Sequence, residues 1–275
     1  MKRKPGYYWW IVIACVAAVF ILPKIKAKLP EAPEMKQGYR IEFSSDFKPA
    51  LASMDELGIS VVIAVDVSGS MYDPPAQGGE RKYVQATRAM LEVLEVVKRL
   101  LSNSPKNQMI RLGLIKFSDT AEVILPVTTL DAGTLESFRN SVDDPGIFAP
   151  EGKTALGSAI ERGTEMLAQS GTILRSLIII TDGVNTAGPL PETVLGAVYN
   201  NRNSAFTAEF PVFTNTTLIS LVGFDIESTH FYQLKELGIR VTSASDRNEL
   251  AKVISGILEA DRKSTRLNSS HGKLS

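Results

Sequence analysis

Ser60–Asp73, which reads SVVIAVDVSGSMYD, is the stretch that decides the fold of this chain. It opens with an apolar run rich in β-branched residues, which is typical of a strand buried on both faces of a parallel sheet. The run ends in Asp66, Ser68 and Ser70, and Gly69 allows the chain to turn. These oxygen-bearing side chains leave the carboxyl end of the strand, where open α/β sheets bind ligands. Hard divalent cations take such oxygen ligands.

On its own, D-x-S-x-S fits an ordinary Ser/Gly turn after a buried strand equally well. Two later segments favour a site. Gly152–Leu156, which reads GKTAL, offers the Thr154 hydroxyl at the expected start of a helix. Leu177–Gly183, which reads LIIITDG, is a second buried strand that ends in the carboxylate of Asp182.

The order D-x-S-x-S, then a lone Thr, then T-D-G resembles the von Willebrand factor type A (VWA) domain over roughly residues 58 to 260. The resemblance implies a metal-ion-dependent adhesion site that holds Mg²⁺, or alternatively Mn²⁺ or Ca²⁺. It further implies that Ser68, Ser70 and Thr154 are direct ligands, and that Asp66 and Asp182 act largely through water. Many members of the family have Gly at the position of Lys153.

The family site also implies a partner. If neutral hydroxyls are the direct ligands, the ion stays electrophilic and keeps one coordination position open. An Asp or Glu carboxylate from another protein can fill that position. Mg²⁺ suits this arrangement because it prefers an octahedral oxygen shell and keeps several waters.

The rest of the chain alternates between strand and helix patterns, which predicts a Rossmann-like, doubly wound, mostly parallel sheet with helices on both faces. The short link 117–121 predicts that one edge strand is antiparallel. After the first strand, we expect strands at 111–117, 121–125, 176–181, 217–222 and 239–241, and helices at 80–101, 134–142, 155–169, 191–201, 230–237 and 248–258.

Composition describes an ordinary globular domain with no bias toward nucleic acid. Of the 275 residues, 44% are hydrophobic and 22% charged, and 30 basic residues balance 30 acidic ones. A zero net charge gives no global field that would attract nucleic acid. The single cysteine, Cys15, excludes a disulfide within the chain and a Cys-based zinc site.

Residues 1–28 read as a membrane anchor. A mainly apolar run, Tyr7–Leu22, lies between three basic residues on each side, and its aromatic start suits a membrane interface. Its length is slightly below the roughly 20 residues of a typical spanning helix. A cleaved signal peptide and a lipoprotein modified at Cys15 are the competing interpretations. We expect a single-pass cell-membrane protein with an extracytoplasmic domain, joined by a linker at 29–57 with one accessory strand near 39–43.

Residues 261–275 differ in origin from the domain. The stretch Asp261–His271, DRKSTRLNSSH, resembles the translation of a common sequencing-library adapter. We therefore interpret this tail as an artefact and place the end of the VWA domain at about residue 260.

The sequence predicts a membrane-anchored, metal-dependent protein-binding domain without catalysis, whose partner is a carboxylate-bearing protein, by analogy an AAA+ ATPase or an envelope complex. Two alternatives stay open: a VWA fold without metal function, and a Mg²⁺-dependent nucleotide hydrolase, since Gly152-Lys153-Thr154 ends like a P-loop. Against the latter, Ile147 stands where the P-loop needs Gly. A Ser/His/Asp hydrolase is disfavoured because His230 looks like a surface residue.

Overall fold

The computed structural model describes residues 58–102, 109–172, 174–200 and 217–271, all within a compact unit that spans residues 37–275. The predicted anchor, linker and accessory strand lie outside the described residues. Within the described ranges, no helix is long and apolar enough to cross a membrane.

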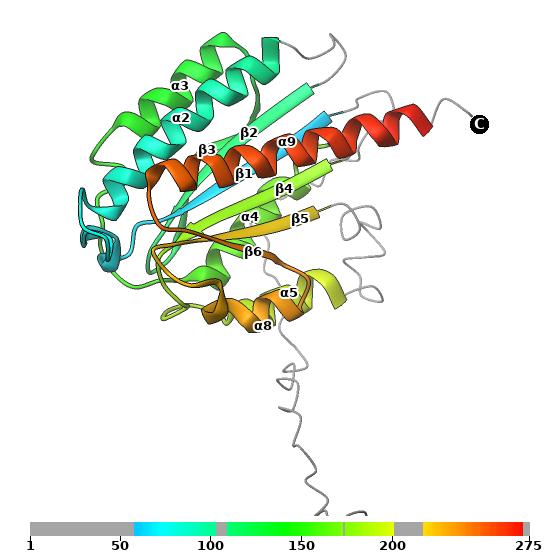
Figure 1. The fold of residues 1–275 in the computed structure, drawn as a ribbon. Helices are drawn as coiled ribbons and strands as arrows, with labels where there is room; N and C mark the ends of the chain where they lie inside the picture. Colours follow the sequence, from blue (N-terminus) through cyan, green and yellow to red (C-terminus); the bar gives the residue numbers. More distant parts are fainter. Residues whose placement is uncertain (1–57, 103–108, 173, 201–216, 272–275) are drawn as a thin grey trace, which may run out of the picture. The chain divides into compact units, whose positions relative to one another are not determined.

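Six strands form one sheet in the order β3-β2-β1-β4-β5-β6 (Figure 1). Neighbouring strands pair in parallel except β2 and β3, which are antiparallel. This arrangement confirms the predicted doubly wound, mostly parallel sheet with one antiparallel edge strand. The strands are β1 Gly58–Asp66, β2 Met109–Phe117, β3 Ala121–Thr129, β4 Leu174–Thr181, β5 Thr217–Phe224 and β6 Arg240–Ala244.

Helices cover both faces of the sheet. One layer contains α2, α3 and α9, and the opposite layer contains α4, α5 and α8 (Figure 1). Their bounds are α2 Lys82–Ser102, α3 Ala132–Asp143, α4 Leu156–Ala168, α5 Pro191–Asn200, α8 Tyr232–Glu236 and α9 Arg247–His271, with short 3₁₀ turns η1 Gly69–Tyr72 and η3 Ser228–Phe231.

The central strand β1 supplies both layers of the core because alternate side chains of a strand point to opposite faces. Val61, Ile63 and Val65 pack in the cluster that contains α2 and α9. Val62 and Ala64 pack in the cluster that contains α4 and α5. Every residue of β1 is buried, as the continuous apolar run predicts.

Most bounds agree to within a few residues, although β5 ends at Phe224 instead of 222 and β6 at Ala244 instead of 241, and three elements differ more. The strand β3 continues to Thr129, beyond the predicted 125, because its pairing with β2 extends over a partly exposed edge that has little apolar pattern. The predicted helix 230–237 is instead the 3₁₀ turn η3 followed by the short helix α8. The last helix continues to His271 through a stretch without Pro or Gly, and Gly272 follows it in the sequence. The artefact origin of this tail stays a prediction.

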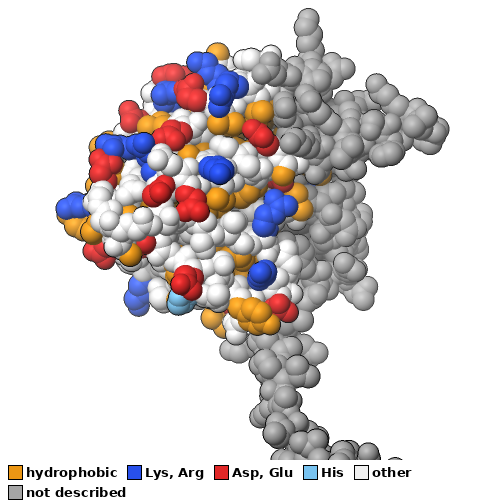
Figure 2. Space-filling view, viewed as in Figure 1, with side chains coloured by type: hydrophobic (Ala, Val, Ile, Leu, Met, Phe, Trp, Pro, Cys, Tyr) orange, Lys and Arg blue, Asp and Glu red, His pale blue; other side chains and the backbone are white. Residues whose placement is uncertain are grey.

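The surface carries charges of both signs. On the face in Figure 2, Lys and Arg side chains are interspersed with Asp and Glu. This distribution agrees with the balanced composition of 30 basic and 30 acidic residues.

Candidate metal centre

The two predicted carboxylates lie next to each other at the carboxyl edge of the sheet. Asp66 is the last residue of β1, and Asp182 follows the last residue of β4. The strands β1 and β4 are parallel neighbours, and Val65 pairs with Ile180. The two strands therefore end at the same edge of the sheet. Burial is the main cause of the raised pKa of Asp66, and the negative charge of the nearby Asp182 adds to it.

The two serines link the turn after β1 to Asp182. The hydroxyl oxygens of Ser68 and Ser70 lie 3.2 Å apart, and the Ser70 hydroxyl donates to Oδ1 of Asp182 at 2.7 Å. Ser68 is buried whereas Ser70 is exposed. The structure thus brings the D-x-S-x-S motif and the T-D-G motif, which are more than a hundred residues apart, into direct contact.

Backbone hydrogen bonds hold the loop before α4 against the turn after β1. The Glu151 amide donates to the Val67 carbonyl at 2.7 Å, and the Gly69 amide donates to the Gly152 carbonyl at 3.0 Å. Gly152 has a φ of +72°, and a Cβ there would lie 2.5 Å from Oδ2 of Asp119. Both the backbone angle and this close approach therefore require glycine.

Thr154 is fixed from the other side by the loop after β4. Its amide donates to the Thr186 hydroxyl at 2.9 Å, and its carbonyl accepts from the amides of Thr186 and Ala187 at 2.8 and 3.1 Å. A Cβ added to Gly183 would lie 3.5 Å from Oγ1 of Thr154, so this hydroxyl faces the turn that follows Asp182. Thr154 is buried, and its placement agrees with the prediction.

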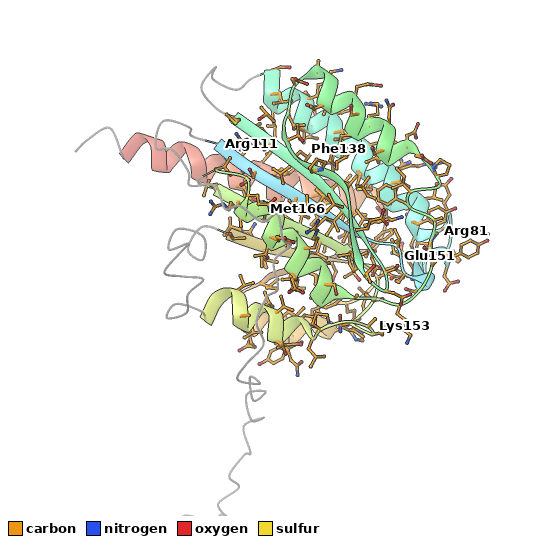
Figure 3. The ribbon with its side chains drawn as sticks, turned by 180° about the vertical axis from the view of Figure 1, so that it is seen from behind. Arg81, Arg111, Phe138, Glu151, Lys153 and Met166 are labelled. Carbon is orange, nitrogen blue, oxygen red and sulfur yellow. The ribbon has the colours of Figure 1, made fainter. Side chains whose placement is uncertain are left out.

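Lys153 contacts a neighbouring loop through its backbone amide and not through its side chain. Its amide donates to Oδ1 of Asp119 at 3.1 Å, and the residue is exposed. Figure 3 shows Lys153 with Glu151 and Arg81 at the same end of the domain. The ammonium of Lys153 is therefore a solvent-facing cation.

Asp66 is the most deeply buried group of the centre. Its Oδ1 accepts the Ser68 amide at 2.7 Å, and its Oδ2 accepts the Thr181 hydroxyl. Burial raises the pKa of Asp66 to about 6, the hydrogen bonds from Thr181 and Ser68 oppose this rise, and the charge of Asp182 adds to it. An ionised Asp66 is thus costly here, and a nearby cation would favour it.

Sequence reasoning missed two residues that contact the carboxylates. Thr181 lies inside the T-D-G motif, and its bond to Asp66 explains why a hydroxyl precedes the aspartate. Lys82 is the first residue of α2, and its Nζ lies 2.9 Å from Oδ2 of Asp182 and 3.6 Å from Oδ2 of Asp225. The D-x-S-x-S motif places its oxygen-bearing residues at alternate positions. This spacing does not indicate that a lysine twelve positions after Ser70 joins the site.

Asn185, in the loop after β4, accepts a hydrogen bond from the Gly157 amide at 3.2 Å. This bond satisfies an amide in the first turn of α4, which has no intrahelical partner. Asn185 thus helps to position the helix that follows Thr154.

The donor set fits a hard divalent cation. Ser68, Ser70 and Thr154 provide hydroxyl oxygens, and Asp66 and Asp182 provide carboxylate oxygens, at one edge of a rigid sheet. Oxygen ligands of this kind suit Mg²⁺, Mn²⁺ or Ca²⁺. Within the described part of the chain, no group of three or more His, Cys, Asp or Glu side chains is arranged to hold a metal ion.

Comparison with known proteins agrees with this geometry. Residues 61–185 match the family model of the von Willebrand factor type A domain. An uncharacterised protein of Borreliella burgdorferi is 28% identical over 176 residues, which cover 64% of this chain. The chain spans about half the length, 46%, of that relative.

Solved structures share the fold at low sequence identity. A D319A mutant of the PilB minor pilin from Streptococcus sanguinis has a TM-score of 0.56 and 15% identity, covering 83% of this chain and 65% of the pilin. BatB from Bacteroides thetaiotaomicron has a TM-score of 0.52 and 19% identity, covering 74% of this chain and 99% of BatB. A von Willebrand factor type A protein from Catenulispora acidiphila has a TM-score of 0.54 and 15% identity, covering 79% of this chain and 51% of that chain. Residues 61–185 are thus similar to the von Willebrand factor type A domain, and the solved structures share the fold of the described chain.

Proposed function

We propose that this chain is a membrane-anchored domain that binds a partner protein through a divalent metal ion and has no catalytic activity of its own. One observation carries the proposal: the hydroxyls of Ser68 and Ser70 lie 3.2 Å apart, and that of Ser70 donates to the buried carboxylate of Asp182.

The proposed metal-site residues differ in charge and therefore in role. Ser68, Ser70 and Thr154 offer neutral oxygens, and Asp66 and Asp182 supply the negative charge that attracts the cation. Mg²⁺, when bound, would supply an electrophilic centre that accepts a carboxylate from the partner. The partner is thus a protein with an accessible Asp or Glu, and an AAA+ ATPase or an envelope complex is the proposed class.

The proposal for the membrane rests on residues 1–28, whose apolar run is flanked by basic residues. In this arrangement the domain is tethered to the cell membrane and faces the extracytoplasmic side. Washing membranes with high salt or carbonate should leave the protein in the pellet, and deletion of residues 1–28 should release a folded domain. Incorporation of labelled palmitate at Cys15 would favour the lipoprotein interpretation instead.

The geometry disfavours the nucleotide hydrolase. A P-loop connects a strand directly to a helix and wraps phosphates with its amides. Here the segment before Gly152 is a loop that follows helix α3, and the Lys153 amide already donates to Asp119. The observations therefore favour a binding module.

The direct test of the proposal is the thermal stability of the full-length protein in Mg²⁺ or Mn²⁺. A ligand that binds only the folded state raises the melting temperature as its concentration exceeds the Kd. Ser70→Ala should reduce this rise, whereas Ser118→Ala, a serine that follows the neighbouring strand β2, should preserve it. A wild-type melting curve that does not change at millimolar metal would contradict the proposal.

A further inference from the structure

The Lys82 ammonium is an internal cation beside the candidate metal centre. Its Nζ is 2.9 Å from Oδ2 of Asp182, and the Asp182 side chain is fully buried whereas the Lys82 side chain is 12% exposed. The other oxygen of Asp182 accepts the Ser70 hydroxyl. Both oxygens of a carboxylate that the metal would attract are thus already engaged, one of them by a positive charge.

Lys82 is held in this position from three directions. Its amide donates to the Asp73 carbonyl at 3.0 Å, which places the first residue of α2 over the site. Its Nζ is also 3.6 Å from Oδ2 of Asp225, at the end of β5. Asp225 in turn accepts the Ala76 amide at 3.1 and 3.0 Å, so the loop before α2 is connected to the same carboxylate.

The charges around the site can be counted. Asp66 and Asp182 are two carboxylates at the centre, and Lys82 neutralises one of them, which leaves a net charge of −1 from these three groups when Asp66 is ionised. Asp225 adds a negative charge on the far side of Lys82. A divalent cation brought to this centre is repelled by the ammonium at short range, and this repulsion is stronger at a buried site than in bulk water.

We propose that Lys82 is a positioning residue that holds Asp182 in place and lowers the affinity of the centre for divalent cations. This inference rests on the proposed metal function and deepens it. The ammonium and the metal compete for the same carboxylate, so the lysine keeps the site weak and exchangeable. With Asp225 included, the four side chains carry a net charge of −2, which a divalent metal just neutralises. Without the ammonium, the same carboxylates would leave the metal-loaded centre at −1, which would repel an anionic partner ligand.

The test measures the Kd of Mg²⁺ and Mn²⁺ for the full-length protein by calorimetry at fixed ionic strength. Lys82→Gln, which keeps a donor for Asp182 but removes the charge, should tighten metal binding by about tenfold. Lys82→Met serves the same purpose if Lys82→Gln does not fold. Lys82→Arg keeps the charge and should bind metal within about twofold of the wild type. Lys153→Met removes an exposed lysine near the site and should also change the Kd by less than about twofold, because solvent screens it.

Each outcome decides between the two proposals. A purely structural role for Lys82 predicts weaker metal binding when it is replaced, so tighter binding in Lys82→Gln supports the inference. If the wild type binds metal and the neutral variants bind equally or more weakly, the inference is wrong and the proposed function stands. If only the neutral variants bind, the inference holds and the metal dependence of the wild type is wrong. If none of them binds, both are overturned.

Discussion

The carboxyl edge of the sheet has two halves that hold their acidic residues differently. In the inner half, at the ends of β1 and β4, Asp66 and Asp182 are buried and accept hydrogen bonds from hydroxyls. In the outer half, at the ends of β5 and β6, Glu227 and Glu249 are exposed around an open hollow of about 590 Å³. Both halves are acidic, but only the inner one combines burial with neutral oxygens.

The outer carboxylates already have a structural task. Asp225 accepts the Ala76 amide, and Glu249 accepts the Ser245 amide at 2.8 Å and its hydroxyl at 2.7 Å. These bonds lower the pKa of Glu249 below its usual range. The comparison teaches that the number of acidic side chains does not locate a cation site. In the inner half, burial raises the pKa of Asp66, and a cation beside this carboxylate would offset the cost of ionising it.

The largest difference between the halves should appear in the response to metal. Asp66→Ala should abolish the metal-induced stabilisation, which for the wild type reaches about 4 kcal/mol when the metal concentration is a thousand times the Kd. Glu249→Gln, in the outer half, should leave this stabilisation unchanged. Differential scanning calorimetry with Mg²⁺ and with EDTA measures both. An equal loss in the two variants would mean that the halves are not distinct.

The next effect is a pH dependence of the inner half in EDTA. The folded-state pKa of Asp66 is about 6, above its ordinary value of 3.8. The folded state therefore binds more protons between these values, and the free energy of unfolding contributed by Asp66 falls as pH rises through this window, by roughly 3 kcal/mol. Above pH 6 this contribution is constant.

Urea unfolding of the wild type and of Asp66→Asn at pH 4 and pH 7 isolates this contribution, because the variant cannot ionise at this position. The stability of the wild type relative to the variant should decrease between the two pH values. Parallel pH profiles for the two proteins would contradict the raised pKa.

A smaller effect should follow from removal of the hydroxyl that supports Asp66. Thr181→Val leaves Oδ2 of Asp66 without this donor in a buried position, and the expected loss of stability is about 2 kcal/mol. Thr242→Val, on the partly buried strand β6, is the matched control and should cost much less. Chemical denaturation at pH 7 in EDTA measures both values. If the two substitutions cost the same, Asp66 does not depend on Thr181.

The smallest expected effect concerns Lys153, which is exposed beside the inner half. Lys153→Gly should leave metal affinity unchanged, since only the backbone amide of this residue makes a contact there. The wild type should neither bind nor hydrolyse ATP. Calorimetry with Mg²⁺ and a phosphate-release assay test the two statements. ATP turnover that is lost in Lys153→Gly would support the nucleotide hydrolase.

The fold could be predicted from the hydrophobic patterns of the strands and helices in the sequence. Buried central strands read as continuous apolar runs, such as Val61–Val65 and Leu177–Ile180, because helices cover both of their faces. The edge strand β3 is partly exposed, so its pattern ended before the strand did. The 3₁₀ turn η3 and the helix α8 are each too short to show a helical period in the sequence. The sequence therefore did not reveal that this segment changes from 3₁₀ to α-helical geometry.

The candidate site was partly predictable. Asp66, Ser68 and Ser70 follow from one strand end, but Thr154 was identified through the family resemblance, since a lone Thr carries no pattern of its own. Its position depends on tertiary hydrogen bonds such as that from Gly69 to Gly152. Lys82 was not predictable, because a lysine at the start of an amphipathic helix usually faces solvent, and only the packing of α2 over the sheet edge turns it toward Asp182.

The central position of β1 has a mechanical consequence. The chain enters the described domain at Gly58, the first residue of β1, and the candidate site begins at Asp66, its last residue. A pulling force between the preceding tether and a ligand held at the site therefore runs lengthwise along one strand. The strand β1 is hydrogen-bonded to β2 on one side and to β4 on the other. A force along β1 therefore shears both sets of interstrand hydrogen bonds. These hydrogen bonds must break together and not one after another. In the proposed function, the strand that organises the core is thus also the one that carries tension between a membrane anchor and a bound partner.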